Sequence, residues 1–201
     1  MWFDIRYNCD EDGPRPESYA EDYNLANQHC KSEDEKSALY KEMKTGAESG
    51  WDYSSRWFVT DKNNNSGCLK DTKPRAIVPV DLNSIMAKNA EILAHFCCLT
   101  KQWVGFYHLI TKSIRVWKWI ETFILNCQAK TDVYETDKRR LTQAMDEVLW
   151  CKDEGIWFDF DLSSGTRRQA FSLSNAWPLW TETYQFQDSV KRERAIEYLR
   201  R

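Results

Sequence analysis

Apolar residues recur with a helical period along most of this chain. The clearest case has apolar side chains at i, i+3, i+4, i+7 and i+8, namely Leu141, Ala144, Met145, Val148 and Leu149. This spacing places apolar side chains on one face of an α-helix. Less regular versions of the pattern run through residues 38–43, 82–96, 117–124 and 188–200. The pattern therefore predicts a mainly helical protein of roughly six or seven helices.

Residues that start and stop helices support this prediction. Residues 18–21 and 32–35 each have a serine followed three positions later by a glutamate. In this arrangement, the capping box, each residue's side chain satisfies a backbone N–H of the other. Asp81 is expected to cap the helix that contains residues 82–96. Gly46 is expected to end the helix that begins near residue 33.

Less regular segments separate the predicted helices. Residues 61–79 are polar and contain two prolines, which predicts a loop. Within residues 156–162, every second position is isoleucine, phenylalanine or leucine, which predicts a short strand. Residues 163–169 have the composition of a turn. Because we find neither an internal repeat nor a domain boundary, we expect residues 1–201 to belong to one domain.

Charge and hydropathy argue against two classes of protein. The chain has 201 residues and a net charge of −3, with no lysine or arginine cluster of the kind that binds nucleic acid. No apolar stretch is long enough to span a membrane, and residues 1–7 lack the layout of a signal peptide. We therefore expect no nucleic-acid partner and no membrane segment in this chain. The compartment stays open between cytoplasmic, secreted and membrane-attached, the last two through a signal peptide in a longer protein.

The cysteines and histidines do not indicate a metal or cofactor site. Seven cysteines and three histidines lie at no spacing that is typical of zinc ligands. Residues 97–98 are adjacent cysteines on the apolar side of a predicted helix, where a buried structural role is expected. Ten tryptophans are an unusually large number for this length. Some of them are expected to offer flat apolar faces on which sugar rings stack.

The first candidate site lies in the stretch G-P-R-P-E-S-Y, residues 13–19. Prolines on both sides of Arg15 restrict its backbone, and Glu17 precedes a predicted helix. A guanidinium that donates and a carboxylate that accepts suit the recognition of hydroxyl groups. A local Arg15–Glu17 ion pair at a helix entry explains the same residues equally well.

The second candidate site lies in A-E-S-G-W-D-Y-S-S-R-W-F, residues 47–58. Gly50 allows close approach of a ligand to the backbone. The large rings of Trp51 and the tyrosine after Asp52 lower the local polarity, which suits a general acid. The alternative is a helix-surface Asp52 paired with Arg56 at i+4, and the local residues favour this alternative.

A third polar group lies in the predicted strand. Asp159 and Asp161 share one face of an extended segment. They either contact sugar hydroxyls or bond the backbone of a loop, and we favour the structural role. Metal binding would need more oxygen ligands than the neighbouring residues offer.

Five ordered motifs across the chain resemble those of the α,α-trehalase family. They are G-P-R-P-E-S-Y, A-E-S-G-W-D-Y-S-S-R-W-F, I-V-P-V-D-L-N, G-x-W-x-D-F-D and S-N-x-x-P-L-W, at residues 13–19, 47–58, 77–83, 155–161 and 174–180. The resemblance implies an all-α fold, part of an (α/α)6 toroid of helical hairpins with the sugar in a central pocket. It also implies hydrolysis of trehalose to two glucose molecules with inversion, without a cofactor.

The resemblance assigns roles to residues at the first two sites. It implies that Asp52, in S-G-W-D, is the general acid. It places Arg15, Pro16 and Glu17, in R-P-E, in contact with trehalose, and Gly50 in contact through its backbone. These implied roles favour the functional interpretation at both sites over the local ion pairs.

Two motifs of the trehalase family have no match in this sequence. The glutamate motif with the family's general base follows S-N-x-x-P-L-W, and the signature G-G-R-F-x-E-x-Y-Y-W-D precedes R-P-E. We therefore expect residues 1–201 to be the middle portion of a trehalase catalytic domain, an incomplete toroid with uncovered apolar faces. The alternatives are a truncated remnant that binds sugar or is inert, and a helical interaction module. The interaction module would explain the helices but neither R-P-E nor S-G-W-D.

Overall fold

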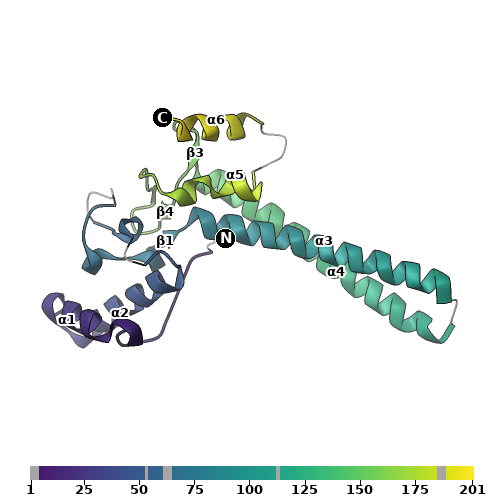
Figure 1. Cartoon of the computed structure of the whole chain (residues 1–201), viewed down its shortest axis with the longest axis horizontal. Coiled ribbons are helices and arrows are strands. Elements are labelled where there is room, and N and C mark those ends of the chain that lie inside the picture. The colour runs from purple at the N-terminus through teal and green to yellow at the C-terminus, as the bar shows by residue number, and fades with distance from the viewer. Residues whose placement is uncertain (1–4, 53, 61–64, 112–113, 185–188) are drawn as a thin grey trace.

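The computed structural model describes residues 5–52, 54–60, 65–111, 114–184 and 189–201, with side chains omitted for 104–122. Helices dominate this described part, as the sequence predicts (Figure 1). The α-helices are α1 (Tyr19–His29), α2 (Glu33–Glu48), α3 (Val80–Thr111), α4 (Ile114–Ala144), α5 (Trp177–Thr181) and α6 (Ser189–Leu199).

Helices α1 and α2 form an antiparallel hairpin with its own small core. Leu39, Tyr40 and Met43 of α2 pack against Ala26 of α1. Ser32 caps α2, because its hydroxyl accepts a hydrogen bond from the Glu35 N–H at 3.2 Å. Ser18 holds the cap position of α1 without such a side-chain bond. The serine half of the predicted capping box is thus confirmed at the second helix, where the Glu35 carboxylate accepts from the Lys31 N–H at 2.6 Å in place of the Ser32 N–H. At the first helix the prediction is wrong, and a 3₁₀ turn leads directly into α1.

The end of α2 differs from the prediction. The helix continues through Gly46 and ends at Glu48. The Ser49 and Gly50 N–H groups donate to the carbonyls of Thr45 and Ala47, at 3.2 and 3.0 Å. Gly50 then adopts a φ of +71°, the left-handed conformation that commonly follows the last turn of a helix. The stop signal is therefore Gly50, because Gly46 keeps a helical backbone.

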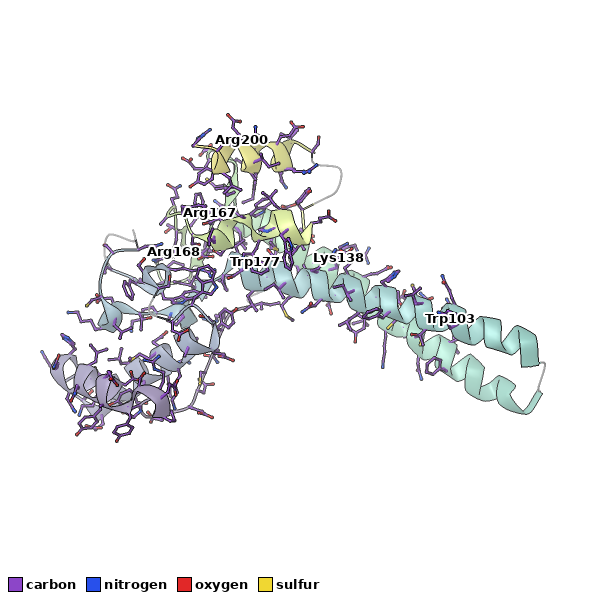
Figure 2. The ribbon with its side chains drawn as sticks, in the orientation of Figure 1. Trp103, Lys138, Arg167, Arg168, Trp177 and Arg200 are labelled. Carbon is purple, nitrogen blue, oxygen red and sulfur yellow. The ribbon has the colours of Figure 1, made fainter. Side chains whose placement is uncertain are left out.

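Helices α3 and α4 form a long hairpin that projects from the rest of the molecule (Figure 1). Each helix is about 48 Å long at 1.5 Å per residue. The buried positions on α3 include the small residues Ala87, Ala90 and Ala94. Larger residues of the arm are exposed, and Figure 2 shows Trp103 on it. They include Leu93 at 43%, Phe96 at 57%, Trp103 at 71% and Leu125 at 63% exposure.

The helix predicted for 82–96 is therefore confirmed, but the burial of its apolar face is not. Leu93 and Phe96 fit the helical spacing and still lie uncovered. Cys97 and Cys98, expected to be buried, are only half-buried. Uncovered apolar faces of this size are what an incomplete helical toroid leaves behind.

Five short strands connect the helices. They are β1 (Ile77–Val78), β2 (Trp150–Cys151), β3 (Ile156–Trp157), β4 (Phe160–Asp161) and β5 (Thr166–Arg167). Their antiparallel sheets have the orders β1-β4-β5 and β2-β3. The strand predicted for 156–162 is thus divided at Phe158 and Asp159. Its alternation does not separate a buried from an exposed face, because Trp157, Asp159 and Asp161 are buried as well.

The main core lies where these strands meet the ends of α3 and α4. Met145, Leu149, Trp150, Trp157 and Phe158 belong to this cluster. The chain continues from α4 into one π-helical segment, Met145–Leu149, before β2. Of the periodic positions in this region, Leu141, Met145 and Leu149 are buried, which confirms the clearest helical pattern in the sequence.

Candidate active site

Asp52 lies in a turn just after α2. The Ser54 N–H donates to the Trp51 carbonyl at 3.2 Å, which closes the turn around Asp52. The indole N–H of Trp57 donates to the same carbonyl at 3.0 Å. Asp52 itself is exposed. Hydrogen bonds therefore hold the described residues on either side of Asp52, which presents its carboxylate to solvent.

The alternative pairing of Asp52 with Arg56 is wrong, because Arg56 is buried and bound elsewhere. Its Nη1 and Nη2 donate to the Asp81 carboxylate, both at 2.8 Å. Its Nε and Nη2 donate to Asp159 at 2.6 and 2.9 Å. Only 2% of Arg56 is exposed. A guanidinium in this fork–fork geometry is fixed in both position and plane.

Tryptophan rings flank the same guanidinium. Its central carbon lies 5.1 Å from the centre of the Trp51 ring and 4.5 Å from that of Trp57, within cation–π range. Burial alone would lower the pKa of Arg56. The charge of Asp159 and the hydrogen bonds to Asp81 and Asp159 outweigh burial and raise this pKa above its ordinary value. Arg56 is therefore a permanent buried cation.

Asp159 also caps α3 from a distance. The helix begins at Val80, whose N–H donates to Asp159 Oδ1 at 2.9 Å. Asp81 lies inside the first turn, so its predicted role as the N-cap is wrong. The reason is that the Asp81 carboxylate faces Arg56, while a carboxylate more than seventy positions along the chain satisfies the helix end.

The second carboxylate of D-F-D is structural too. Asp161 is fully buried and accepts a hydrogen bond from the Ser163 N–H at 2.8 Å. Its Oδ2 lies 3.8 Å from Nη1 of Arg168, and Arg168 Nη2 donates to the Phe58 carbonyl at 2.7 Å. Burial lowers the pKa of Arg168, and the charge of Asp161 opposes this effect. The structural role favoured for Asp159 and Asp161 is confirmed.

The predicted sugar-contact residues divide between buried and exposed positions. Arg15 is 4% exposed, and its Nε and Nη2 donate to the Asp22 carboxylate, both at 2.9 Å. The Arg15 backbone N–H donates to Asp22 at 3.0 Å. Pro16 and Glu17 are exposed in the 3₁₀ turn before α1. Arg15 therefore pairs with Asp22, which the sequence interpretation missed, in place of Glu17.

Both candidate sites lie at the same end of the α1–α2 hairpin. In an antiparallel hairpin the start of the first helix adjoins the end of the second. Contacts from the segment before Arg15 confirm this, since Lys44 Nζ donates to the Asp12 carbonyl at 3.0 Å and the Cys9 N–H donates to Thr45 Oγ1 at 3.0 Å. The fold thus gathers R-P-E and S-G-W-D in one region.

Gly50 has a conformational role that a substitution can measure. We expect Gly50→Ala to lower the free energy of unfolding by about 1 kcal/mol, because its φ of +71° strains an L-residue while a Cβ there meets no atom within 4 Å. Gly46→Ala is the matched control, with equal space but a helical backbone, and should raise stability by about 0.5–1 kcal/mol. Urea denaturation measures both. A stabilising Gly50→Ala would contradict the assigned turn.

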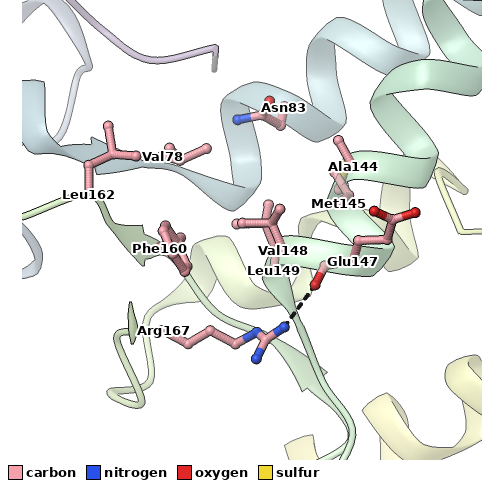
Figure 3. A pocket seen from close by; sticks show the side chains of 10 residues that line it. All are labelled: Val78, Asn83, Ala144, Met145, Glu147, Val148, Leu149, Phe160, Leu162 and Arg167. Carbon is pink, nitrogen blue, oxygen red and sulfur yellow. Dashed lines mark hydrogen bonds between the residues drawn. The ribbon is translucent and has the colours of Figure 1, made fainter. Parts of the chain in front are cut away.

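An apolar cavity lies away from these residues. It has a volume of about 440 Å³ and is lined by the start of α3, the π-helical end of α4 and β4 (Figure 3). Arg167 donates from Nη2 to the Glu147 carbonyl at 2.9 Å across its rim. None of the predicted site residues lines it.

Two kinds of feature do not occur among the described residues. In that part of the chain, no group of three or more histidine, cysteine, aspartate or glutamate side chains is placed to hold a metal ion. No helix within the described ranges combines the length and apolarity needed to cross a membrane.

Comparisons with known proteins identify the family of this chain. The family model described as Trehalase matches residues 4–201. Trehalase from Apis mellifera is 39% identical over 191 residues, which cover 95% of this chain and 26% of that protein. Trehalase from Pimpla hypochondriaca is 36% identical over 197 residues, with 98% and 29% covered.

A solved structure supports the fold. The neutral trehalase Nth1 of Saccharomyces cerevisiae has a TM-score of 0.61 and 16% sequence identity, with 96% of this chain and 33% of that chain covered. This chain therefore has the fold of part of a larger helical protein, and it spans between a quarter and a third of these three proteins' length. With a family model that matches residues 4–201, the chain belongs to the trehalase family.

Proposed function

We propose that this chain is the part of an α,α-trehalase that supplies the general acid, Asp52. The observation that carries the proposal is the contrast between Asp52 and its neighbours. Arg56, Asp81 and Asp159 are buried and bound to one another, whereas Asp52 is exposed on a closed turn. A solvent-facing carboxylate beside hydrogen-bonded backbone can bring a proton to a glycosidic oxygen.

The remaining predicted residues take roles around this acid. Glu17 is exposed at the same end of the hairpin and can accept hydrogen bonds from sugar hydroxyls. Pro16 and Gly50 offer backbone at exposed positions. Arg15, oriented by Asp22, lies at the same end of the hairpin, and we assign it the contact with trehalose that the R-P-E motif implies. We propose trehalose as the substrate of the protein that contains these groups.

An inverting glycosidase needs a second carboxyl group, a base roughly 6.5–9.5 Å from the acid. No stretch of residues 1–201 resembles the family's base motif, and we propose that this segment is the middle of the catalytic domain. On its own, the chain should therefore release negligible glucose from trehalose. The truncated remnant predicts the same for the isolated chain, so a test needs the missing parts.

A chimeric protein can supply the missing parts of the catalytic domain. In the Apis chimera, residues 4–201 replace the matched segment of the Apis mellifera trehalase. Inversion at one anomeric carbon of trehalose should release one β-glucose for each α-glucose, which proton NMR resolves before mutarotation. Initial release of α-glucose alone would contradict an inverting mechanism. A folded chimera without turnover would favour the inert remnant.

A further inference from the structure

The contacts of Arg56 suggest a role in the proposed reaction beyond that of an ion pair. The guanidinium packs on the ring of Trp51, the residue directly before Asp52, and on the ring of Trp57. Trp57 in turn donates its indole N–H to the Trp51 carbonyl, the acceptor that also closes the Asp52 turn. Trp51 and Trp57, which make two of the contacts that hold this turn, therefore both pack on Arg56.

We propose that Arg56 is a positioning residue for Asp52: its guanidinium, clamped by Asp81 and Asp159, fixes Trp51, the residue directly before the acid. This inference rests on the proposed function, because it takes Asp52 as the proton donor. It adds a residue that influences the reaction by positioning Asp52, without contacting the sugar.

The clamp joins three parts of the chain that are distant in sequence. Asp81 belongs to the first turn of α3, and Asp159 lies between β3 and β4 while also capping α3. Arg56 therefore fixes the position of the turn that contains Asp52 relative to the start of α3 and the core strands. A planar guanidinium held by two carboxylates fixes direction as well as distance, which a lysine ammonium does not.

Arg56 does not act by touching the sugar. Its Nε, Nη1 and Nη2 all donate to carboxylates, and 2% of the residue is exposed. A ligand would have to break bonds at 2.6–2.9 Å to reach it. Arg56 therefore affects the reaction through the position of Asp52. Proton transfer is sensitive to that position, because a displacement of about 1 Å can lower a rate roughly a hundredfold.

Hydrogen exchange in the 201-residue chain tests whether Arg56 holds the turn. In Arg56→Lys, exchange of the Ser54 amide and the Trp57 indole N–H should accelerate at least about tenfold, with amides in the middle of α2 unchanged. Arg75→Lys is the matched control. This arginine also bonds two side chains, Asn8 and Asp10, but its side chain is 30% exposed. Unchanged exchange at both protons, or equal acceleration throughout the chain, would overturn the proposal.

Turnover in the Apis chimera tests the catalytic consequence. We expect Arg56→Lys to lower kcat by roughly a hundredfold with KM nearly unchanged, since a misplaced acid still permits substrate binding. Arg75→Lys should change neither constant. A rise in KM at constant kcat would show that Arg56 serves binding, and the positioning role would be wrong.

The same experiments separate failure of this inference from failure of the proposed function. If Asp52→Asn leaves kcat intact, the proposed function fails whatever Arg56 does. If Asp52→Asn lowers kcat and Arg56→Lys does not, only the role of Arg56 fails. Should Arg56→Lys not fold, Asp81→Asn loosens the clamp and keeps the guanidinium. It should speed exchange at the same two protons, and unchanged exchange there would contradict the proposal.

Discussion

Asp159→Leu is expected to lower the free energy of unfolding by about 3–5 kcal/mol, the largest stability effect of any substitution considered for this chain. The change leaves Arg56, a buried cation, with Asp81 as its remaining anion. It also removes the acceptor for the Val80 N–H at the start of α3. Burying donors that have lost their acceptor, the Arg56 Nε–H and the Val80 N–H, is costly, because water no longer solvates either group.

Urea denaturation followed by circular dichroism measures this effect. Asp10→Leu is the matched control, because Asp10 also pairs with an arginine, Arg75, at 3.0 Å, but is 72% exposed at its side chain. Exposed pairs contribute little, so this control should change stability by less than about 1 kcal/mol. Equal losses of unfolding free energy in the two variants would show that the buried Arg56 ion pairs stabilise the fold no more than an exposed pair does, which would contradict the prediction.

Asp52→Asn in the Apis chimera should lower kcat for trehalose by about 10³-fold. An amide cannot donate the proton that the leaving oxygen needs, and general acid catalysis contributes about 10²–10⁴-fold. Folding should be unaffected, because Asp52 is exposed on its turn. Glu48→Gln removes a nearby exposed carboxylate at the end of α2 and should leave kcat unchanged. A similar loss in both variants would point to general electrostatics in place of proton donation.

Periodicity predicted the helices of this chain because each helix buries a stripe of its own sequence. Residues 141–149 show this well, since Leu141, Met145 and Leu149 recur at every fourth position and are buried. Which apolar face is covered depends on neighbours. Leu93 and Phe96 fit the helical pattern and lie exposed on the α3–α4 arm. The incomplete toroid expected from the resemblance accounts for this exposure.

Local signals failed where a distant residue supplied the partner. Asp81 looked like a helix cap, yet Asp159 takes that place. Arg56 looked like a partner for Asp52, yet its carboxylates come from 25 and 103 positions away. Spacing rules for ion pairs apply within one helix, and none of them reaches across such separations.

From the sequence, the candidate site could be predicted only as separate motifs, without their arrangement in space. The sequence placed Arg15, Glu17, Gly50 and Asp52 in short stretches rich in prolines, glycines and aromatic residues. The hairpin of α1 and α2 brings these stretches to one end, which requires the antiparallel packing of two helices. Asp22 was missed because a carboxylate one turn into an amphipathic helix has the appearance of a solvated residue.

The central claim, that Asp52 is the general acid, is tested most directly by changing the leaving group. Fluoride departs from α-glucosyl fluoride without being protonated, so this substrate does not need the acid. In the Apis chimera, Asp52→Asn should lower kcat for trehalose by about 10³-fold and kcat for α-glucosyl fluoride by less than about tenfold. Equal losses on the two substrates, or no loss on trehalose, would contradict the account.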